Sequence, residues 1–111
     1  MKTAALVGDL MDRSKIGAAV PDIDFAPAPS ACTGADVVVV DLGGHAGEVA
    51  ELRRVAPRAR IVAFGRHDNP EALARARKDG ADVALPRSRF FRDPAAALQV
   101  TPRAGGGSEL P

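Results

Sequence analysis

The sequence has no tryptophan or tyrosine, only one cysteine, and no apolar run long enough to cross a membrane. A span needs about 20 apolar residues, and Asp9 interrupts the N-terminus before the apolar part of a secretion signal could develop. Cys32 has no second cysteine for an internal disulfide or for a C-x-x-C site that binds zinc or performs redox chemistry. We therefore expect a protein that is neither exported nor membrane-embedded and that works in the reducing cytoplasm.

The composition indicates one folded domain. The chain has 111 residues, 46% hydrophobic and 26% charged, which is a globular balance in the size range of single domains. Residues 1–100 are expected to form this domain, and the glycine- and proline-rich residues 101–111 a flexible tail. The net charge is only +1, but three basic and eight acidic residues precede Leu52, whereas twelve basic and six acidic residues follow it. This polarity favours oriented docking onto a charged partner.

Short apolar runs rich in β-branched residues predict buried strands. Four runs are strong, and residues 23–26 form a weaker fifth; the strong ones are residues 3–7, 35–40, 60–64 and 82–85. Helical stretches lie between or after them, at residues 11–20, 47–55, 70–79 and 94–98. Such alternation predicts right-handed crossovers and an α/β fold with a doubly wound, mainly parallel five-stranded sheet. Ligands of such sheets bind at the carboxyl ends of the strands.

The connection between the weak second strand and the third is too short for a full crossover helix. Only Pro27 to Thr33 separates the two strands, and Pro27 and Pro29 interrupt any helix there. We expect the second helix to be shortened or lost.

The stretch DVVVVDLGGHAGEVAELRRVAPRARIVAFGRHDNPEALARARKDGADVALPRSRF resembles the receiver domains of two-component response regulators. It has, in order, an acid that ends the central strand, a glycine-led helix, a proline before the fourth strand, and Gly80-Ala81-Asp82 at the entry to the fifth. The resemblance implies a flavodoxin-like or receiver-like sheet with strand order 2-1-3-4-5, and a role in signal transduction. It covers roughly residues 3–98.

The resemblance also implies which residues would carry phosphorylation. Asp41 takes the position of the phosphoacceptor, and Asp9 and Asp41 take positions of the acids that hold Mg²⁺. The other acid position falls at Gly8, the hydroxyl position at Gly65 and the lysine position at Arg87. Only Asp9 and Asp41 match, so the resemblance is to a receiver with a degenerate phosphorylation site. Losing one carboxylate weakens Mg²⁺ binding, and an arginine does not reproduce the compact ammonium group of lysine.

Each polar residue at the strand ends also has a structural interpretation. Asp41 could cap the loop that follows it by accepting backbone N–H groups, and Asp9 could be the N-cap of the first helix. Gly43-Gly44 is interpreted as a plain turn rather than an anion-binding nest. His45 and His67 could bind a transition metal together with carboxylates, but no pair has helical i, i+4 spacing, which favours exposed loop histidines.

Basic residues gather in the last part of the chain. They are Arg66, Arg75, Arg77, Lys78, Arg87, Arg89 and Arg92. In receivers the corresponding face is the output and dimerisation surface, so Arg75, Arg87, Arg89 and Phe91 are candidate contacts for a protein partner or a second copy. Alternatively, the arginines are solvated and Phe90 and Phe91 cover the core.

The favoured interpretation is a phosphorylation-independent, receiver-like interaction module. Two alternatives stay open: a phosphoacceptor modified at Asp41, and a small metal- or ligand-binding domain. Nucleic acid is disfavoured as a partner because the net charge is near zero and no aromatic stacking platform is visible. No enzymatic reaction is expected, because the sequence has neither a nucleophile motif nor a cofactor motif.

Overall fold

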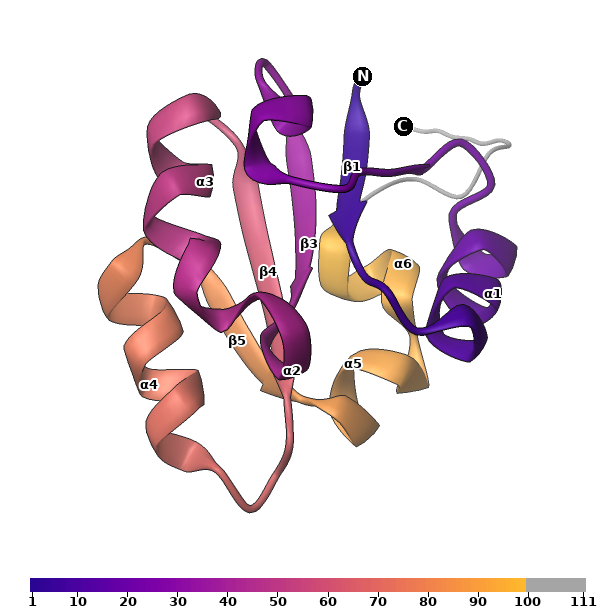
Figure 1. The fold of residues 1–111 in the computed structure, drawn as a ribbon. Helices are drawn as coiled ribbons and strands as arrows, with labels where there is room; N and C mark the ends of the chain where they lie inside the picture. Colours follow the sequence, from indigo (N-terminus) through magenta and orange to yellow (C-terminus); the bar gives the residue numbers. More distant parts are fainter. Residues whose placement is uncertain (100–111) are drawn as a thin grey trace, which may run out of the picture.

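The computed structural model describes residues 1–99. They form a five-stranded parallel sheet in the order β2-β1-β3-β4-β5, with helices on both faces (Figure 1). This order confirms the predicted doubly wound topology 2-1-3-4-5. The tail expected at residues 101–111 lies outside the described residues.

The strands match the predicted apolar runs. Their bounds are β1 Thr3–Leu6, β2 Asp24–Phe25, β3 Val37–Asp41, β4 Arg60–Gly65 and β5 Val83–Pro86. The central strand β3 is buried on both faces from Val37 to Val40, as expected of a parallel sheet covered by helices. Asp41 pairs in register with Phe64, which places its carboxylate at the carboxyl edge of the sheet.

Helices cover the two faces of the sheet as separate layers (Figure 1). On one face lie α1 Leu10–Ala19, α5 Arg87–Arg92 and α6 Pro94–Leu98. The other face carries α3 Val49–Val55 and α4 Pro70–Asp79, together with the 3-10 turn η1 Pro29–Cys32. Between β3 and α3 the chain forms the short helix α2 Leu42–His45 and the 3-10 turn η2 Ala46–Glu48.

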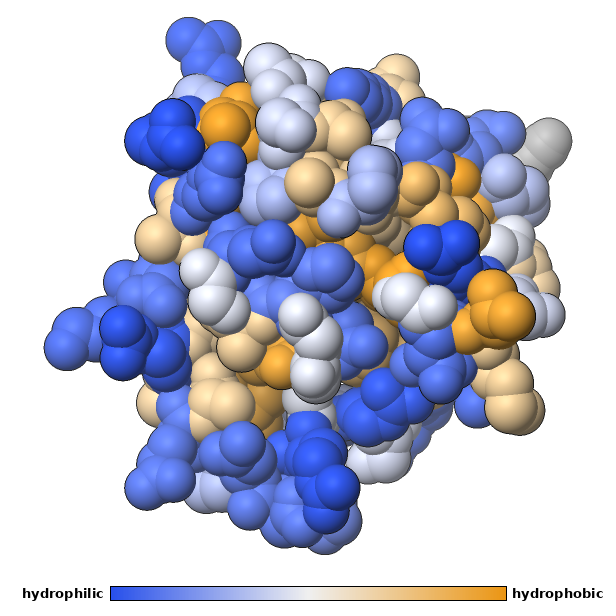
Figure 2. Space-filling view, viewed as in Figure 1, coloured by the Kyte–Doolittle hydropathy of each residue, from blue (hydrophilic) through white to orange (hydrophobic). Residues whose placement is uncertain are grey.

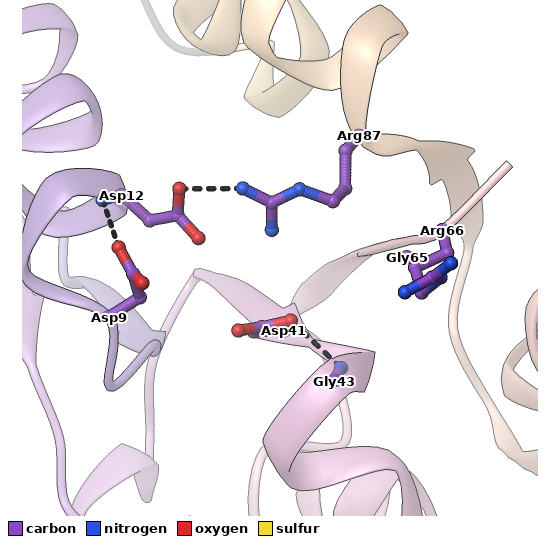
Figure 3. A pocket seen from close by; sticks show the side chains of 7 residues that line it. All are labelled: Asp9, Asp12, Asp41, Gly43, Gly65, Arg66 and Arg87. Carbon is purple, nitrogen blue, oxygen red and sulfur yellow. Dashed lines mark hydrogen bonds and ion pairs between the residues drawn. The ribbon is translucent and has the colours of Figure 1, made fainter.

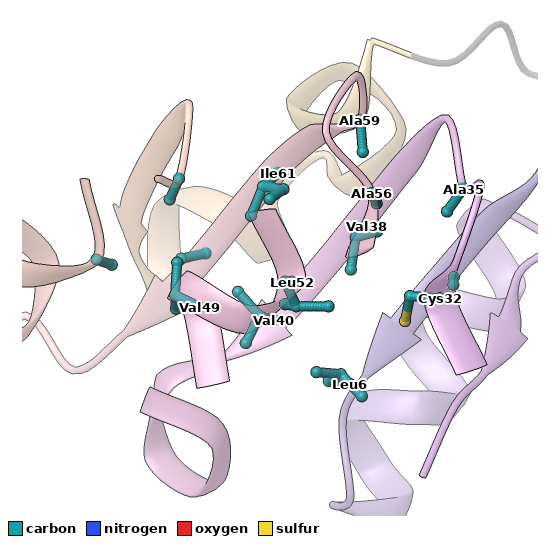
Figure 4. Packing of buried hydrophobic residues seen from close by; sticks show 14 of the residues in the cluster. Leu6, Cys32, Ala35, Val38, Val40, Val49, Leu52, Ala56, Ala59 and Ile61 are labelled. Atoms are coloured by element: carbon teal, nitrogen blue, oxygen red, sulfur yellow. The ribbon is translucent and has the colours of Figure 1, made fainter. Parts of the chain in front are cut away.

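Alternate residues of each strand pack into two apolar cores, one on each face of the sheet. Leu6, Val40 and Ile61 point toward α3, where Val49 and Leu52 pack against them (Figure 4). The opposite residues of the strands pack against Ile16 of α1, Phe90 of α5 and Leu98 of α6. The period of two in each strand therefore builds both layers at once.

Side-chain caps set the helix boundaries at the carboxyl edge. The Asp9 carboxylate accepts the Asp12 N–H and begins α1 at Leu10. Asn69 caps α4, with Pro70 in its first turn. At the other end of α4, before β5 begins, Gly80 ends the helix with φ 126°, a conformation that favours glycine. The caps therefore fix where the loops that follow β1 and β4 pass into helices.

Most connections follow the expectations. The second helix is reduced to the turn η1, as expected from the prolines. The turn predicted at Gly43-Gly44 was wrong, because these glycines lie inside α2, where the Asp41 side chain accepts the Gly43 N–H and caps the first turn. The predicted 47–55 helix begins only at Val49. Residues Arg87–Arg92 form a helix that the sequence pattern did not predict.

Within the described residues, no helix combines the length and the apolar character that crossing a membrane requires.

Candidate functional site

The candidate site is a pocket at the carboxyl edge of the sheet, where the chain leaves β1, β3, β4 and β5. It has a volume of about 320 Å³ (Figure 3). The residues that line it are Asp9, Asp12, Asp41, Gly43, Gly65, Arg66 and Arg87. Four of the five residues to which the resemblance assigned phosphorylation roles thus lie together, as the topology predicts.

An ion pair between Asp12 and Arg87 crosses this pocket. Arg87 Nη2 donates to Asp12 Oδ1 at 2.7 Å. The Asp12 side chain is only 4% exposed, whereas that of Arg87 is 40% exposed, so the buried carboxylate depends on this guanidinium for charge compensation. The hydrogen bond that Arg87 donates to Asp12 raises the pKa of Arg87 above its usual value, and the nearby carboxylates of Asp41 and Asp9 act in the same direction. Arg87 is therefore a permanent cation among three acids.

Aromatic side chains hold the Arg87 guanidinium in place. Its central carbon lies 5.4 Å from the ring centroid of Phe64 and 5.2 Å from that of Phe91. Contacts of this kind attract a cation to the face of the ring. Arg87 is thus fixed by a carboxylate on α1, a ring on β4 and a ring on α5.

Asp9 and Asp41 each have one oxygen bonded to the backbone. Asp9 Oδ1 accepts the Asp12 N–H at 2.9 Å, and Asp41 Oδ1 accepts the Gly43 N–H at 2.8 Å. Asp9 is therefore the N-cap of α1, as its structural interpretation stated, and Asp41 caps the short helix α2 rather than a loop. Figure 3 shows both carboxylates at the pocket.

The residues do not fit the Mg²⁺ ion that the resemblance implies. A divalent cation needs several free oxygen ligands. Here Asp12 is paired with Arg87, and Asp9 and Asp41 each have one oxygen committed to the backbone. In the described part of the chain, no three His, Cys, Asp or Glu side chains are arranged so that they could hold a metal ion. The positive charge among these acids comes from Arg87 instead.

Gly65 occupies the end of β4, where the resemblance expects a hydroxyl. A Cβ atom there would lie 3.3 Å from Leu42 Cδ1 and 3.5 Å from Leu73 Cδ2. The Cβ of a serine or threonine would therefore make a tight contact with Leu42 and an ordinary one with Leu73. Gly8, at the missing acid position, has no atom within 4 Å of such a Cβ.

A second hollow of about 350 Å³ adjoins the pocket through its shared arginines. Arg66, His67, Arg87 and Ser88 line it. Arg66 donates two hydrogen bonds to Asp68, at 2.9 and 2.8 Å, and this contact lowers the pKa of Asp68 to about 2.

The two histidines occupy different environments. His67 is exposed in the loop between β4 and α4, whereas His45 Nδ1 lies 2.5 Å from Glu48 Oε1. His45 thus has a carboxylate partner within its own turn, and His67 fits the prediction of an exposed loop histidine.

The residues proposed for partner binding differ in how free they are. Arg75 pairs with Asp79 on the surface of α4, and Arg87 turns toward Asp12. Phe91 is half-buried, with its ring centroid 5.1 Å from that of Phe64. Arg89 is exposed, and no hydrogen bond or ion pair of the described residues involves it. Of the four candidates, Arg89 is therefore the one that stays available on the surface.

Sequence reasoning missed Asp12. The local signal was present, since Asp9 and Asp12 have the spacing of a helix N-cap and the third residue of the helix. Nothing near Asp12 in the sequence indicates that it is buried or that its partner is Arg87. Asp12 is the carboxylate that pairs with Arg87 at the site.

No protein-family model matches the chain. No curated protein sequence matches it either.

Solved structures do match. A response regulator of Burkholderia pseudomallei, solved with a phosphorylated aspartic acid, calcium and citrate, has a TM-score of 0.72 and 21% identity over 89% of this chain and 67% of its own. A receiver domain of Clostridium thermocellum has a TM-score of 0.72 and 16% identity over 88% of this chain and 90% of its own. A CheY-like protein (tadZ) of Pseudomonas aeruginosa has a TM-score of 0.70 and 14% identity over 89% of this chain and 97% of its own. The chain therefore has the fold of response-regulator receiver domains.

Proposed function

We propose that this chain is a receiver-like signalling module that acts through protein contacts and does not depend on phosphorylation of Asp41. The ion pair between Asp12 and Arg87 is the observation that carries the proposal. The proposed role is non-enzymatic and belongs to the cytoplasm. It rests on the receiver fold, on the ion pair between Asp12 and Arg87, and on the glycine at position 65.

The charge arrangement supports a site fixed in one state. A phosphoryl group on Asp41 would bring additional negative charge next to Asp9 and Asp12, in a site without fitting metal ligands. To compensate the charge of the phosphoryl group, Arg87 would have to leave Asp12. Arg87 is held in place by that buried carboxylate and by two aromatic rings. Pulling Arg87 away would leave Asp12 buried without a counter-ion.

The packing at Gly65 supports the same conclusion. Phosphorylation switches report the new phosphoryl group through a donor that moves toward it. Gly65 has no side chain to donate, and Leu42 and Leu73 lie close to where its Cβ would be. The site therefore has no hydroxyl at this position to carry a signal from Asp41 to the surface.

The surface of α5 is the contact face that the proposal favours. Arg89 and Arg92 are exposed and three residues apart, on one side of the helix. Beneath them, Phe90 is fully buried and Phe91 half-buried, which anchors the helix to the sheet. This arrangement fits an acidic surface on a protein partner.

Intact-mass spectrometry after incubation with acetyl phosphate and Mg²⁺ tests the proposal. We expect no phosphoryl adduct on the wild-type chain and none on Asp41→Asn. A labile adduct on the wild-type chain that is absent from Asp41→Asn would show a phosphoacceptor and would overturn the proposal. Circular dichroism of both proteins controls for loss of fold.

A further inference from the structure

A hollow of about 350 Å³ lies where the loop after β4 meets the start of α5. Arg66 and His67 line it from the loop, and Arg87 and Ser88 line it from α5. All four side chains can donate hydrogen bonds, and no carboxylate is among the lining residues. The hollow therefore suits a ligand that accepts hydrogen bonds, in contrast to the neighbouring acidic pocket.

Both arginines of the hollow keep unused donors. An arginine has five N–H donors in a planar group. Among the described residues, Arg87 donates only from Nη2, to Asp12, and Arg66 only from Nε and Nη2, to Asp68. Figure 3 shows the bond to Asp12 at one terminal nitrogen of Arg87 and none at the other. Each guanidinium group thus has N–H groups left for a ligand.

The two guanidinium groups are held in place before any ligand binds. A carboxylate and two aromatic rings hold Arg87, and two hydrogen bonds to Asp68 hold Arg66. Side chains that are already ordered lose little conformational entropy on binding. The hollow is therefore preorganised in its charged groups.

We propose that the hollow receives one carboxylate side chain, aspartate or glutamate, of the protein partner. This inference rests on the proposed function, because it assumes a partner that docks beside α5. A planar carboxylate matches the fork of N–H groups that a guanidinium presents. The Ser88 hydroxyl and the His67 ring supply further donors to the same group.

Charge favours a carboxylate over a phosphate group in this hollow. Each arginine already has one carboxylate partner, Asp12 for Arg87 and Asp68 for Arg66. The hollow thus offers donors rather than a large excess of positive charge. A phosphate group carries a charge of about −1.5 to −2 at neutral pH and would be repelled by both acids more strongly than a carboxylate with a single charge.

The surface around the hollow favours a protein partner over a small ligand. Ser88 and Arg92 lie four residues apart on one side of α5, and Arg89 is exposed next to them. The lower edge of the molecule in Figure 2, where α5 and the loop before α4 lie, is largely hydrophilic, whereas small-molecule pockets are mainly apolar. The hollow therefore fits an acidic segment of a protein, which would place one carboxylate in the hollow and others near Arg89 and Arg92.

An amide NMR titration of the full chain with the capped peptide acetyl-GEGEGEG-amide tests this inference. The glutamine peptide acetyl-GQGQGQG-amide is the control, since it keeps the length and loses the charge. We expect saturable shifts at His67 and Ser88 in the millimolar range with the glutamate peptide and none with the glutamine peptide. Equal responses to the two peptides, or no shift at His67 and Ser88, would overturn the inference.

A pair of variants locates the contact. Arg66→Gln removes one guanidinium group and leaves the pair between Asp12 and Arg87 intact, so the dissociation constant of the glutamate peptide should rise about fivefold. Arg75→Gln makes the same change in an ion pair on α4 and should leave the dissociation constant unchanged. Equal weakening by both variants would indicate general charge attraction and would refute binding in the hollow.

Two further ligands separate the possible sources of the anion. Acetate at the same carboxylate concentration should not saturate the shifts, because it cannot contact the hollow and Arg89 at once. A peptide with phosphoserine at the central acidic position should bind no more tightly than the glutamate peptide. Saturation by acetate, or tighter binding of the phosphopeptide, would overturn the assignment to a partner's carboxylate. Because the proposed function is tested by the phosphoryl adduct on Asp41, the two proposals can fail separately.

Discussion

Arg87 Nη2 donates to Asp12 Oδ1 at 2.7 Å and so joins two residues that lie 75 positions apart in the chain. The pair connects the start of α5 to the first turn of α1 across the carboxyl edge of the sheet. It neutralises a buried carboxylate and fills the acidic side of the pocket with a cation that belongs to the protein. The buried Asp12 carboxylate is thus charge-compensated without any added ion.

Removing Arg87 should destabilise the fold. Arg87→Ala leaves Asp12 buried without a counter-ion and removes the contacts over Phe64 and Phe91. Fully buried pairs lose 3–5 kcal/mol when one partner is removed; since Arg87 is 40% exposed, we expect a loss of about 1–3 kcal/mol. Urea denaturation followed by circular dichroism measures it.

An exposed ion pair gives the control for this experiment. Arg75 pairs with Asp79 on the surface of α4, and Arg75→Ala should change the free energy of unfolding by no more than about 0.5 kcal/mol. The double variant Asp12→Asn/Arg87→Ala should cost less than the sum of its single changes, because each removes the same interaction. Strict additivity would show that the pair is not coupled.

Adding the missing hydroxyl should also cost stability. Gly65→Thr places new atoms against Leu42 and Leu73, so we expect a loss of about 1–3 kcal/mol from overpacking. Gly8→Thr makes the same change where nothing lies within 4 Å of the Cβ, and its cost should stay within about 0.5 kcal/mol. Equal costs for the two variants would contradict the packing described at the end of β4.

The sequence predicts the fold better than the site. The β-branched runs that became β3 and β4 are local signals, and each needs only its own residues to be interpreted. The partner of Arg87 could not be predicted in this way, because Asp12 lies 75 positions away and nothing near either residue indicates that they pair. Helix α5 was missed for a similar reason: Arg87–Arg92 has no capping side chain, and its helical form comes from burying Phe90 against the sheet.

Gly80 should tolerate no side chain. Its φ is 126°, and a Cβ would lie 2.9 Å from the Cβ of Arg53. Arg53 donates to the Gly80 carbonyl from Nε at 3.1 Å and from Nη2 at 2.8 Å, so a shift here also weakens the contact between α3 and the end of α4. We expect Gly80→Ala to lower the free energy of unfolding by about 1–3 kcal/mol.

Gly17 provides the control for the substitution at Gly80. It lies inside α1, and a Cβ there would meet nothing within 4 Å. Gly17→Ala should raise the thermal midpoint, because alanine is favoured over glycine in a helix by about 0.5–1 kcal/mol. If the thermal midpoints of Gly80→Ala and Gly17→Ala were both above or both below that of the wild-type chain, this interpretation would be refuted.

The pair between Arg66 and Asp68 should show in the titration of Asp68. The hydrogen bonds from Arg66 lower the pKa of Asp68 from 3.8 to about 2. A lowered carboxyl pKa stabilises the folded state above 3.8, and this contribution is lost as the pH falls toward 2. Carboxyl carbon shifts in an NMR titration measure the pKa, and Arg66→Gln should return it toward 3.8. Arg75→Gln should leave Asp68 unchanged.

An amide NMR titration with Mg²⁺ and beryllofluoride tests the central claim most directly. Beryllofluoride with Mg²⁺ imitates a phosphoryl group on an aspartate, so a phosphorylatable site responds with saturable shifts around that residue. We predict no saturable shift at Asp41, at Gly65 or along α5 when the ligands are added, and the same lack of response in Asp41→Asn. Saturable shifts centred on Asp41 that reach α5 and disappear in Asp41→Asn would contradict the account.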